Sequence, residues 1–147
     1  MERMKRMPKL SVLMGIYNEK RKEQVELAIS SILNQSYRDF EFIICDDGST
    51  KEFFLWLQEY CKTDERIRLI RNEKNAGLAV ALNRCLTEAK GEYIARMDAD
   101  DISFPDRFEK QIDFLEKHPQ YAMVGCAVSL IDEEGSWGVR IPAQKPQ

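Results

Sequence analysis

"FEFIICDDGST", residues 40–50, joins an apolar run to two carboxylates and then to a helix start. The run from Phe40 to Cys45 predicts a β-strand. The residues from Asp46 to Ser49 are turn formers, and either Ser49 or Thr50 can cap a following helix. This stretch therefore predicts a strand, a tight turn and a helix in direct succession.

The same succession recurs on both sides of this stretch. Apolar runs predict further strands at Leu10–Tyr17, Arg66–Arg71 and Glu92–Met97. Apolar residues at helical spacing predict helices around residues 25–33, 53–61 and 78–89, with Gly91 as the stop of the third. Further on, the sequence predicts a helix that begins at Pro105, with an inner face of Phe108, Ile112 and Leu115, a fifth strand at Ala122–Ile131, and a hairpin partner at residues 137–141.

The alternation of strands and helices predicts an α/β fold of the Rossmann-like type. Right-handed crossovers give a mainly parallel sheet with helices on both faces. The third strand is more polar, so we expect it near an edge of the sheet. Ligands of such sheets bind outside the carboxyl ends of the strands. "YNE" (residues 17–19), the pair Asp46–Asp47 and the acids from Asp98 to Asp101 all follow strands, so they should meet at one edge.

Composition narrows the class of protein. The chain has 147 residues, 44% of them hydrophobic, which fits a tail over residues 1–7 and a single domain over residues 8–147. A net charge of −3 with scattered Lys and Arg argues against a nucleic-acid partner. No apolar leader precedes the first strand, and the four cysteines lack metal-ligand spacing. We expect reduced core cysteines and a cytoplasmic location, which in the full-length protein can be peripheral to the inner face of the membrane.

The carboxylates Asp98 and Asp100 form a D-x-D pair. In extended chain, positions i and i+2 point to the same side. Two hard oxygen ligands on one side suit Mg²⁺ or Mn²⁺, which proteins hold through one or two carboxylates plus substrate phosphates. The alternative is that these acids only solubilise a loop and cap the next helix. Their place at the predicted ligand edge favours the metal.

The second acidic cluster has two interpretations that need not compete. Asp46 and Asp47 can fix the turn at Gly48, or one of them can face a ligand and accept an N–H from a nucleobase. Gly77 stands near the start of the third helix, whose N-terminal amides can hold an anion, although it can equally be an ordinary loop residue. No phosphate-cradling glycine motif occurs, so a metal would have to neutralise a bound diphosphate.

Four segments together resemble the family 2 glycosyltransferases of the GT-A fold, the nucleotide-diphospho-sugar transferase fold. They are "SVLMGIYNE" (11–19), "SSILNQSYRDFEFIICDDGST" (30–50), "NAGLAVALN" (75–83) and "GEYIARMDADDISFPDRFEKQIDFLEKHP" (91–119). The resemblance implies inverting transfer of a sugar from a nucleotide diphosphate donor, with a UDP-sugar favoured, to a hydroxyl of an unknown saccharide or lipid-linked acceptor. It also implies Mn²⁺ or Mg²⁺ as cofactor.

The resemblance assigns roles to residues of this chain. It places Tyr17 and Glu19 in the nucleotide pocket, Asp47 on the base, Lys74 and Gly77 near the nucleotide, Asp98 at the ribose and donor sugar, and Asp100 on the metal. Many family members carry an arginine just before the asparagine that matches Asn83. Here that residue is Leu82, which weakens a charge-based role for this helix.

The resemblance leaves the catalytic base unknown. In the family, the base is an acid well downstream of the D-x-D, whereas Asp132, Glu133 and Glu134 have the pattern of a hairpin turn. We therefore expect a domain truncated at its C-terminus, the donor-binding half of a longer protein, with little transfer by itself. We also expect this chain to self-associate through residues 129–141.

Two other functions fit parts of the pattern. Phosphoacceptor receiver domains are α/β proteins with an acidic pair and Mg²⁺, but their pair follows the first strand, where this chain has "YNE". Nucleotidyltransferases also use paired acids and metal, but they usually need a glycine-rich basic loop near the start. Both remain alternatives to the glycosyltransferase.

Overall fold

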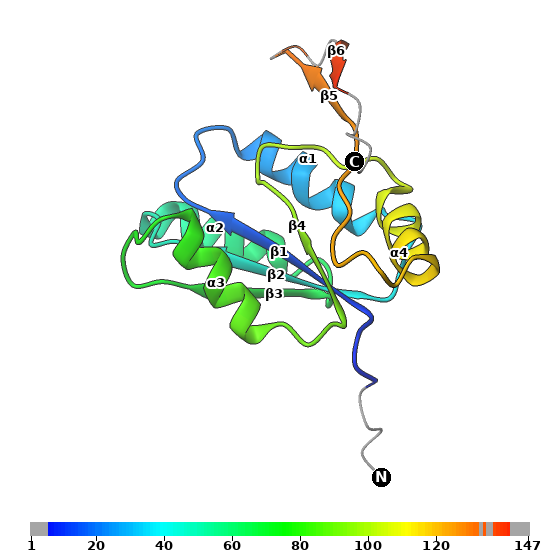
Figure 1. Ribbon diagram of the computed structural model, residues 1–147. Coiled ribbons are helices and arrows are strands. Elements are labelled where there is room, and N and C mark those ends of the chain that lie inside the picture. Colours follow the sequence, from blue (N-terminus) through cyan, green and yellow to red (C-terminus); the bar gives the residue numbers. More distant parts are fainter. Residues whose placement is uncertain (1–5, 133, 135–136, 142–147) are drawn as a thin grey trace. The chain divides into compact units, whose positions relative to one another are not determined.

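A parallel sheet of four strands lies at the centre of the first of two compact units (Figure 1). The computed structural model describes residues 6–132, 134 and 137–141. The boundary between the units falls between Pro105 and Asp106. The expected division into a tail that ends at residue 7 and one domain over residues 8–147 stays a prediction.

The four strands of the sheet are those that the apolar runs predict. They are β1 (Leu10–Ile16), β2 (Phe40–Asp46), β3 (Ile67–Arg71) and β4 (Tyr93–Arg96), in the order β3-β2-β1-β4, and all neighbours are parallel. The two central strands are almost completely buried, as continuous apolar runs require in a sheet covered on both faces. The more polar β3 lies at an edge, which confirms that expectation.

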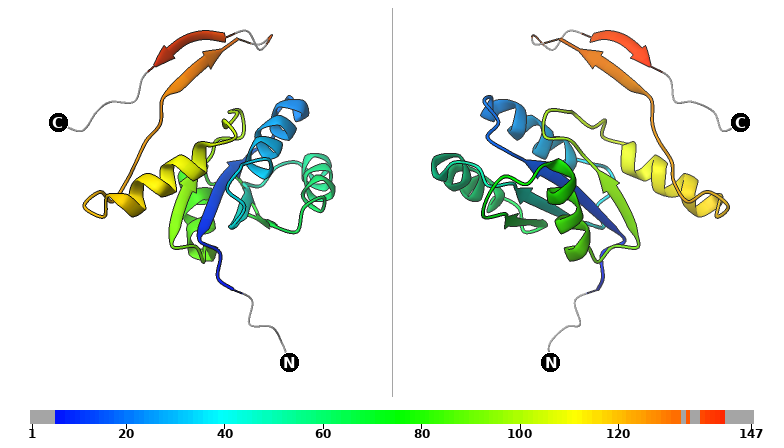
Figure 2. Two further views of the ribbon diagram at one scale, coloured as in Figure 1. Left: turned by 90° about the vertical axis from the view of Figure 1, so that its right-hand side faces the viewer. Right: turned by 60° about the vertical axis from the view of Figure 1, so that its left-hand side comes forward.

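Helices cover both faces of this sheet. α3 (Leu78–Glu88) lies on one face, and α1 (Lys22–Leu33) and α2 (Lys51–Cys61) lie on the other (Figures 1 and 2). Under α3, a cluster of buried side chains joins the helix to β1 and β2; its members are Leu13, Ile43, Cys45, Ala81 and Cys85. The predicted α/β fold with a parallel sheet and helices on both faces is therefore confirmed.

Gly91 does not end α3, contrary to the prediction. The helix ends at Glu88, and Ala89 is already extended, with φ −68° and ψ 138°. The glycine serves a close approach of two chain segments instead. Its N–H donates to Ser11 Oγ at 2.8 Å. A Cβ at this position would lie 2.5 Å from the backbone nitrogen of Ser11 and 2.6 Å from the carbonyl carbon of Leu10.

The second unit contains α4 (Arg107–Lys117) and a hairpin of β5 (Val128–Ile131) and β6 (Trp137–Ile141). The helix begins two residues after Pro105, because Pro105 and Asp106 form a turn and Asp106 is the N-cap. Its residues Phe108 and Ile112 are buried, whereas Leu115 is only half-buried.

The hairpin confirms one prediction and corrects two. β5 and β6 pair antiparallel, as expected. The predicted strand over Ala122–Ile131 is too long, because regular pairing starts only at Val128. Cys126, expected in a core, is exposed, whereas the other three cysteines are buried. Within the described residues, no helix is long and apolar enough to cross a membrane.

The crowding at Gly91 leads to a first prediction. Gly91→Ala should lower the free energy of unfolding by about 1 to 3 kcal/mol, because the new methyl group meets backbone that cannot rotate away. Gly125→Ala is the matched control, since a Cβ there has no neighbour within 4 Å. Urea unfolding of both variants measures the difference. Equal midpoints for the two variants would contradict the close approach at Ser11.

Candidate functional site

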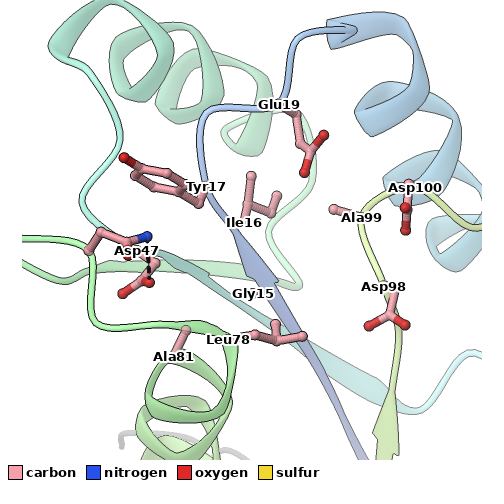
Figure 3. A pocket seen from close by; sticks show the side chains of 11 residues that line it. Gly15, Ile16, Tyr17, Glu19, Asp47, Leu78, Ala81, Asp98, Ala99 and Asp100 are labelled. Carbon is pink, nitrogen blue, oxygen red and sulfur yellow. Dashed lines mark hydrogen bonds between the residues drawn. The ribbon is translucent and has the colours of Figure 1, made fainter.

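A pocket of about 450 Å³ opens where β1, β2 and β4 end, at the carboxyl edge of the sheet (Figure 3). Its lining consists of Gly15, Ile16, Tyr17, Glu19, Asp47, Asn75, Leu78, Ala81, Asp98, Ala99 and Asp100. Five of the seven residues that the sequence assigned to the site therefore lie in one pocket. The other two, Lys74 and Gly77, do not line it, although both belong to the loop between β3 and α3.

The pocket is acidic. Glu19, Asp47, Asp98 and Asp100 contribute carboxylates to its lining, and the lining contains no Lys, Arg or His. Burial, and then the negative charge of Asp100, raise the pKa of Glu19 above its ordinary value. Like charges are thus crowded in this pocket, which favours a bound cation.

Asp47 connects the turn after β2 to the loop before α3. Its side chain is only 2% exposed. Oδ1 accepts from Asn72 Nδ2 at 2.6 Å, and Oδ2 accepts from Asn75 Nδ2 at 3.1 Å and from the Gly77 N–H at 2.7 Å. The Ala76 N–H lies 3.1 Å from both oxygens. One buried carboxylate thereby holds the whole loop from Asn72 to Gly77.

These hydrogen bonds determine the protonation of Asp47. Burial by itself raises the pKa of this carboxyl, but the hydrogen bonds from Asn72, Ala76 and Gly77 outweigh it and hold the pKa below its ordinary value. The amides of Ala76 and Gly77 at the start of α3 are therefore engaged by the protein itself. The expectation that the N-terminal amides of α3 hold an anionic ligand stays a prediction for the first turn of the helix, which begins at Leu78.

Asp46 fixes the turn from the other side. The side chain is fully buried, and its Oδ2 lies 3.1 Å from Arg71 Nε and 3.3 Å from the Ser49 N–H. Thr50, one of the two candidate caps, accepts from the Phe53 N–H at the start of α2. Both aspartates of the pair thus hold loops in place, and only Asp47 also reaches the pocket.

Gly48 allows the two loops to touch. It has φ +74°, and a Cβ there would lie 2.4 Å from the carbonyl carbon of Lys74 and 2.5 Å from the nitrogen of Asn75. The backbone of the Lys74 loop therefore packs directly on the Asp47 turn. Lys74 contributes to the site through its backbone in this way, while its side chain is exposed.

Asn18 positions the two pocket residues that flank it. It adopts φ 43°, a left-handed conformation that Asn tolerates better than most residues. Its N–H donates to Ser49 Oγ at 2.9 Å, and its Oδ1 accepts from the Thr50 N–H at 2.8 Å. These bonds attach the loop after β1 to the turn after β2, and they hold Tyr17 and Glu19 at the pocket.

The D-x-D segment is anchored at both ends. At its start, the Met97 N–H donates to Leu13 O at 3.0 Å. At its end, the buried amide of Gln35 donates to Phe104 O at 2.6 Å, and the Ser103 N–H donates to Ser31 Oγ at 3.0 Å. The arc between these anchors brings both acids of the motif to the pocket, and Asp101 does not line it. Ala99 and Asp100 lie in a turn, so the extended chain assumed for the i, i+2 pair is absent here.

Sequence reasoning missed the polar residues that support the acids. Asn72, Asn75, Gln35 and Asn18 act mainly through hydrogen bonds to backbone or carboxylate groups of other loops. Only their position next to strand or helix ends hints at such a role. Arg84 was also missed: its guanidinium donates to Asn72 Oδ1 at 2.7 Å and so supports the loop that Asp47 holds.

The donor set of the pocket fits a hard divalent cation. Asp98 and Asp100 supply carboxylate oxygens, and the crowding of Glu19 against Asp100 would be relieved by positive charge. Among the described residues, no group of three or more acidic, His or Cys side chains is arranged to hold an ion by itself.

Comparisons with known proteins show which family this chain resembles in sequence. The sequence model of the family "Glycosyl transferase family 2" matches residues 11–146. A putative glycosyltransferase of Bacillus subtilis, EpsE, is 48% identical over 141 residues, which is 95% of this chain and 50% of that protein. A putative teichuronic acid biosynthesis glycosyltransferase of the same organism, TuaG, is 38% identical over 88% of this chain and 50% of its own length.

Solved structures show the same fold. The mannosyltransferase PcManGT from Pyrobaculum calidifontis, in complex with GDP-Man and Mn²⁺, superposes with a TM-score of 0.67 at 26% identity, over 87% of this chain and 36% of its own. S. aureus TarS 1-349 in complex with UDP-GlcNAc has a TM-score of 0.67 at 24% identity, over 76% and 32% of the two chains. The chain spans about half the length of the curated relatives.

The hydrogen bonds of Asp47 predict an acid-dependent contribution to stability. Because its pKa is lowered in the fold, the stabilisation is fully present above the ordinary value of 3.8 and is lost as pH falls through the lowered value. Asp47→Asn should cost on the order of 2 kcal/mol at neutral pH, and progressively less in acid. Glu73→Gln, an exposed change in the same loop, is the control. Urea unfolding across pH measures both, and a cost independent of pH would contradict the role of the ionised carboxylate.

Proposed function

The chain belongs to glycosyl transferase family 2, and from this premise we propose that it is the donor-binding half of an enzyme that transfers a sugar from a nucleotide diphosphate to an acceptor hydroxyl. The supporting observation is the pocket at the carboxyl edge of the sheet, which collects Tyr17, Glu19, Asp47, Asp98 and Asp100. Family membership removes the receiver domain and the nucleotidyltransferase as alternatives.

The nucleoside would occupy the side of the pocket formed by Tyr17 and Asp47, which both line it (Figure 3). The Tyr17 side chain is 46% exposed, so its ring offers an apolar surface to a base. Asp47 would accept an imino N–H, which favours a UDP-sugar over donors whose base has no such group. Glu19 completes the wall, and Gly77 acts through its N–H on Asp47. Lys74, exposed on the neighbouring loop, would be the cation near the nucleotide.

The diphosphate and the sugar would lie toward the D-x-D acids. Asp98 would bind the ribose and donor sugar, and Asp100 would hold Mn²⁺ or Mg²⁺. When bound, the ion would neutralise the diphosphate charge and so stabilise the leaving nucleoside diphosphate. The pocket lining has no cationic side chain that can do this. The anchors at Leu13, Gln35 and Ser31 keep the acids at the pocket.

Transfer with inversion needs a general base within hydrogen-bond reach of the acceptor hydroxyl. We place this base outside the present chain, together with most of the acceptor site. Its acceptor would be a saccharide or a lipid-linked sugar.

We further propose a cytoplasmic location, with contact to the inner face of the membrane in the whole protein, and self-association of this chain through residues 129–141. Val128, Leu130 and Ile141 in this hairpin are about half exposed, which supports such an apolar contact.

The metal proposal predicts ion-dependent nucleotide binding. UDP should bind more tightly with Mn²⁺ than without it, because the pocket offers acids and no cation to the diphosphate. Asp100→Asn should remove most of this difference and leave the fold intact. Asp101→Asn removes the same charge one residue further on, outside the pocket lining, and should keep the difference. Calorimetric titrations with and without the ion provide the test. Equal UDP affinity in both conditions for the parent chain would refute the proposal.

The base proposal predicts selectivity between pyrimidines. Asp47→Ala should weaken UDP binding about tenfold more than CDP binding, a difference of about 1.4 kcal/mol, because cytosine offers no imino N–H. Competition titrations with the two nucleotides compare them directly. Since Asp47 also holds the Asn72–Gly77 loop, unfolding midpoints are measured in parallel. An equal loss for both nucleotides, with a lowered midpoint, would show that the residue acts only on the loop.

A further inference from the structure

The edge strand β3 offers backbone groups to a partner. In the parallel ladder with β2, the Phe42 N–H donates to Arg66 O at 2.8 Å, and the Asn72 N–H donates to Asp46 O at 2.8 Å. The strand therefore uses its even-numbered residues from 66 to 72 for β2. The N–H and C=O groups of Ile67, Leu69 and Arg71 point to the open edge.

Two of these outward groups already have partners inside the chain. The Ile67 N–H donates to Asp64 O at 3.1 Å, and Arg71 O accepts from the Arg84 guanidinium. Within the described residues, no recorded hydrogen bond occupies the remaining four groups, which are Ile67 O, Leu69 N, Leu69 O and Arg71 N.

The open set is complementary to itself. In an antiparallel pair centred on Leu69, each Leu69 exchanges two hydrogen bonds with its counterpart, and each Arg71 N–H meets the Ile67 O of the other strand. A complete ladder would also join the Ile67 N–H of each copy to the Arg71 O of the other. These are the two groups that already have hydrogen-bond partners within their own chain. We propose that a second copy of this chain adds its β3 to this edge, antiparallel and with Leu69 opposite Leu69.

The side chains on the α2 face of the edge fit this pairing. A groove of about 320 Å³ lies between α2 and β3, and it is lined by Phe54, Gln58 and Cys61 of the helix and by Ile67, Leu69, Ile70 and Arg71 of the strand, with residues of their connection. Side chains at Ile67, Leu69 and Arg71 share one face of β3. A twofold axis through the Leu69 pair would place the second Leu69 beside the first, next to this groove.

Charge does not protect this edge. Charged side chains on edge strands usually prevent pairing. Here the arginines of the segment are matched within the chain: Arg66 pairs with Asp64, Arg68 with Glu88 and Arg71 with Asp46. The pairing would therefore not bring uncompensated arginines together. A peptide from another protein could also use an open edge, but the self-complementary set of groups favours a second copy.

Cross-linking tests the register. In a chain with Cys126→Ser, which removes the exposed thiol, Leu69→Cys should form a disulfide-linked dimer when diamide accepts the two electrons and two protons. The two Cα atoms would be about 5.5 Å apart, within disulfide range. Ile67→Cys is the matched control, because its two copies would lie about 14 Å apart along the strands. No dimer with Leu69→Cys, or equal yields for both variants, would overturn the proposal.

Sedimentation tests the hydrogen bonds. The chain is first given Val128→Lys and Leu130→Lys, so that association through the hairpin is suppressed. In that background the chain should still dimerise with rising concentration. Leu69→Pro should abolish the dimer, because it removes an outward N–H without breaking a bond to β2, and Leu69→Val should retain it. A background chain that is monomeric at every concentration would overturn the proposal, as would a dimer unaffected by Leu69→Pro. If Leu69→Pro does not fold, the cross-linking result decides.

Discussion

The candidate site depends on the buried carboxylate of Asp47. The loop from the end of β3 to the start of α3 wraps around it and contributes backbone amides and carboxamides rather than opposite charge. A buried charge solvated only by neutral donors requires every donor to be in place, because each lost hydrogen bond leaves the charge less compensated. Gly48 allows the loops to come close enough, and Asn18 attaches the β1 loop to the same turn. The geometry of the pocket follows from these contacts.

The same arrangement explains why the pocket is negative. Backbone amides next to a helix start often bind anions in proteins. Here the N–H groups of Ala76 and Gly77 donate to the carboxylate of Asp47 instead. Arg71 and Arg84, two cations that contact residues around this network, donate to Asp46, to backbone carbonyls and to Asn72. These two cations thus support the loops, Arg96 pairs with Asp98 at 2.7 Å, and no cationic residue belongs to the pocket lining itself. A metal ion bound together with a phosphate ligand, as proposed above, would supply charge compensation that the pocket lining does not offer.

The parts of the structure that sequence predicted well are those governed by a repeated pattern. Burial on both faces requires continuous apolar runs, so β1 and β2 were clear, and the charges of β3 placed it at an edge. The clustering of the acids followed from the topology of a parallel sheet alone.

The sequence-based predictions failed where a single tertiary contact determines the local structure. Glycine is the residue type that often follows the end of a helix, but α3 ends before Gly91. At this position glycine is needed because the backbone of Ser11 lies too close for a side chain. The apolar run predicts a strand that starts six residues before Val128, where β5 actually begins. The start of β5 is set by its pairing with β6 and not by hydrophobicity. Gln35, buried beside the D-x-D segment, has no periodicity that would reveal its partner Phe104, which lies far along the chain.

The proposed recognition of a base by Asp47 makes binding and loop order compete for the same oxygens. Both carboxylate oxygens already accept at least two N–H groups, so an incoming imino N–H has to share or replace one of them. Asn75 is the donor most easily replaced, since it is exposed, lines the pocket and donates at 3.1 Å. Asn72 is buried and donates at 2.6 Å, and the Gly77 N–H donates at 2.7 Å, so these two bonds can hold the loop while Asn75 turns away. Recognition of the base would then release one side chain at the mouth of the pocket without dismantling the turn that shapes it.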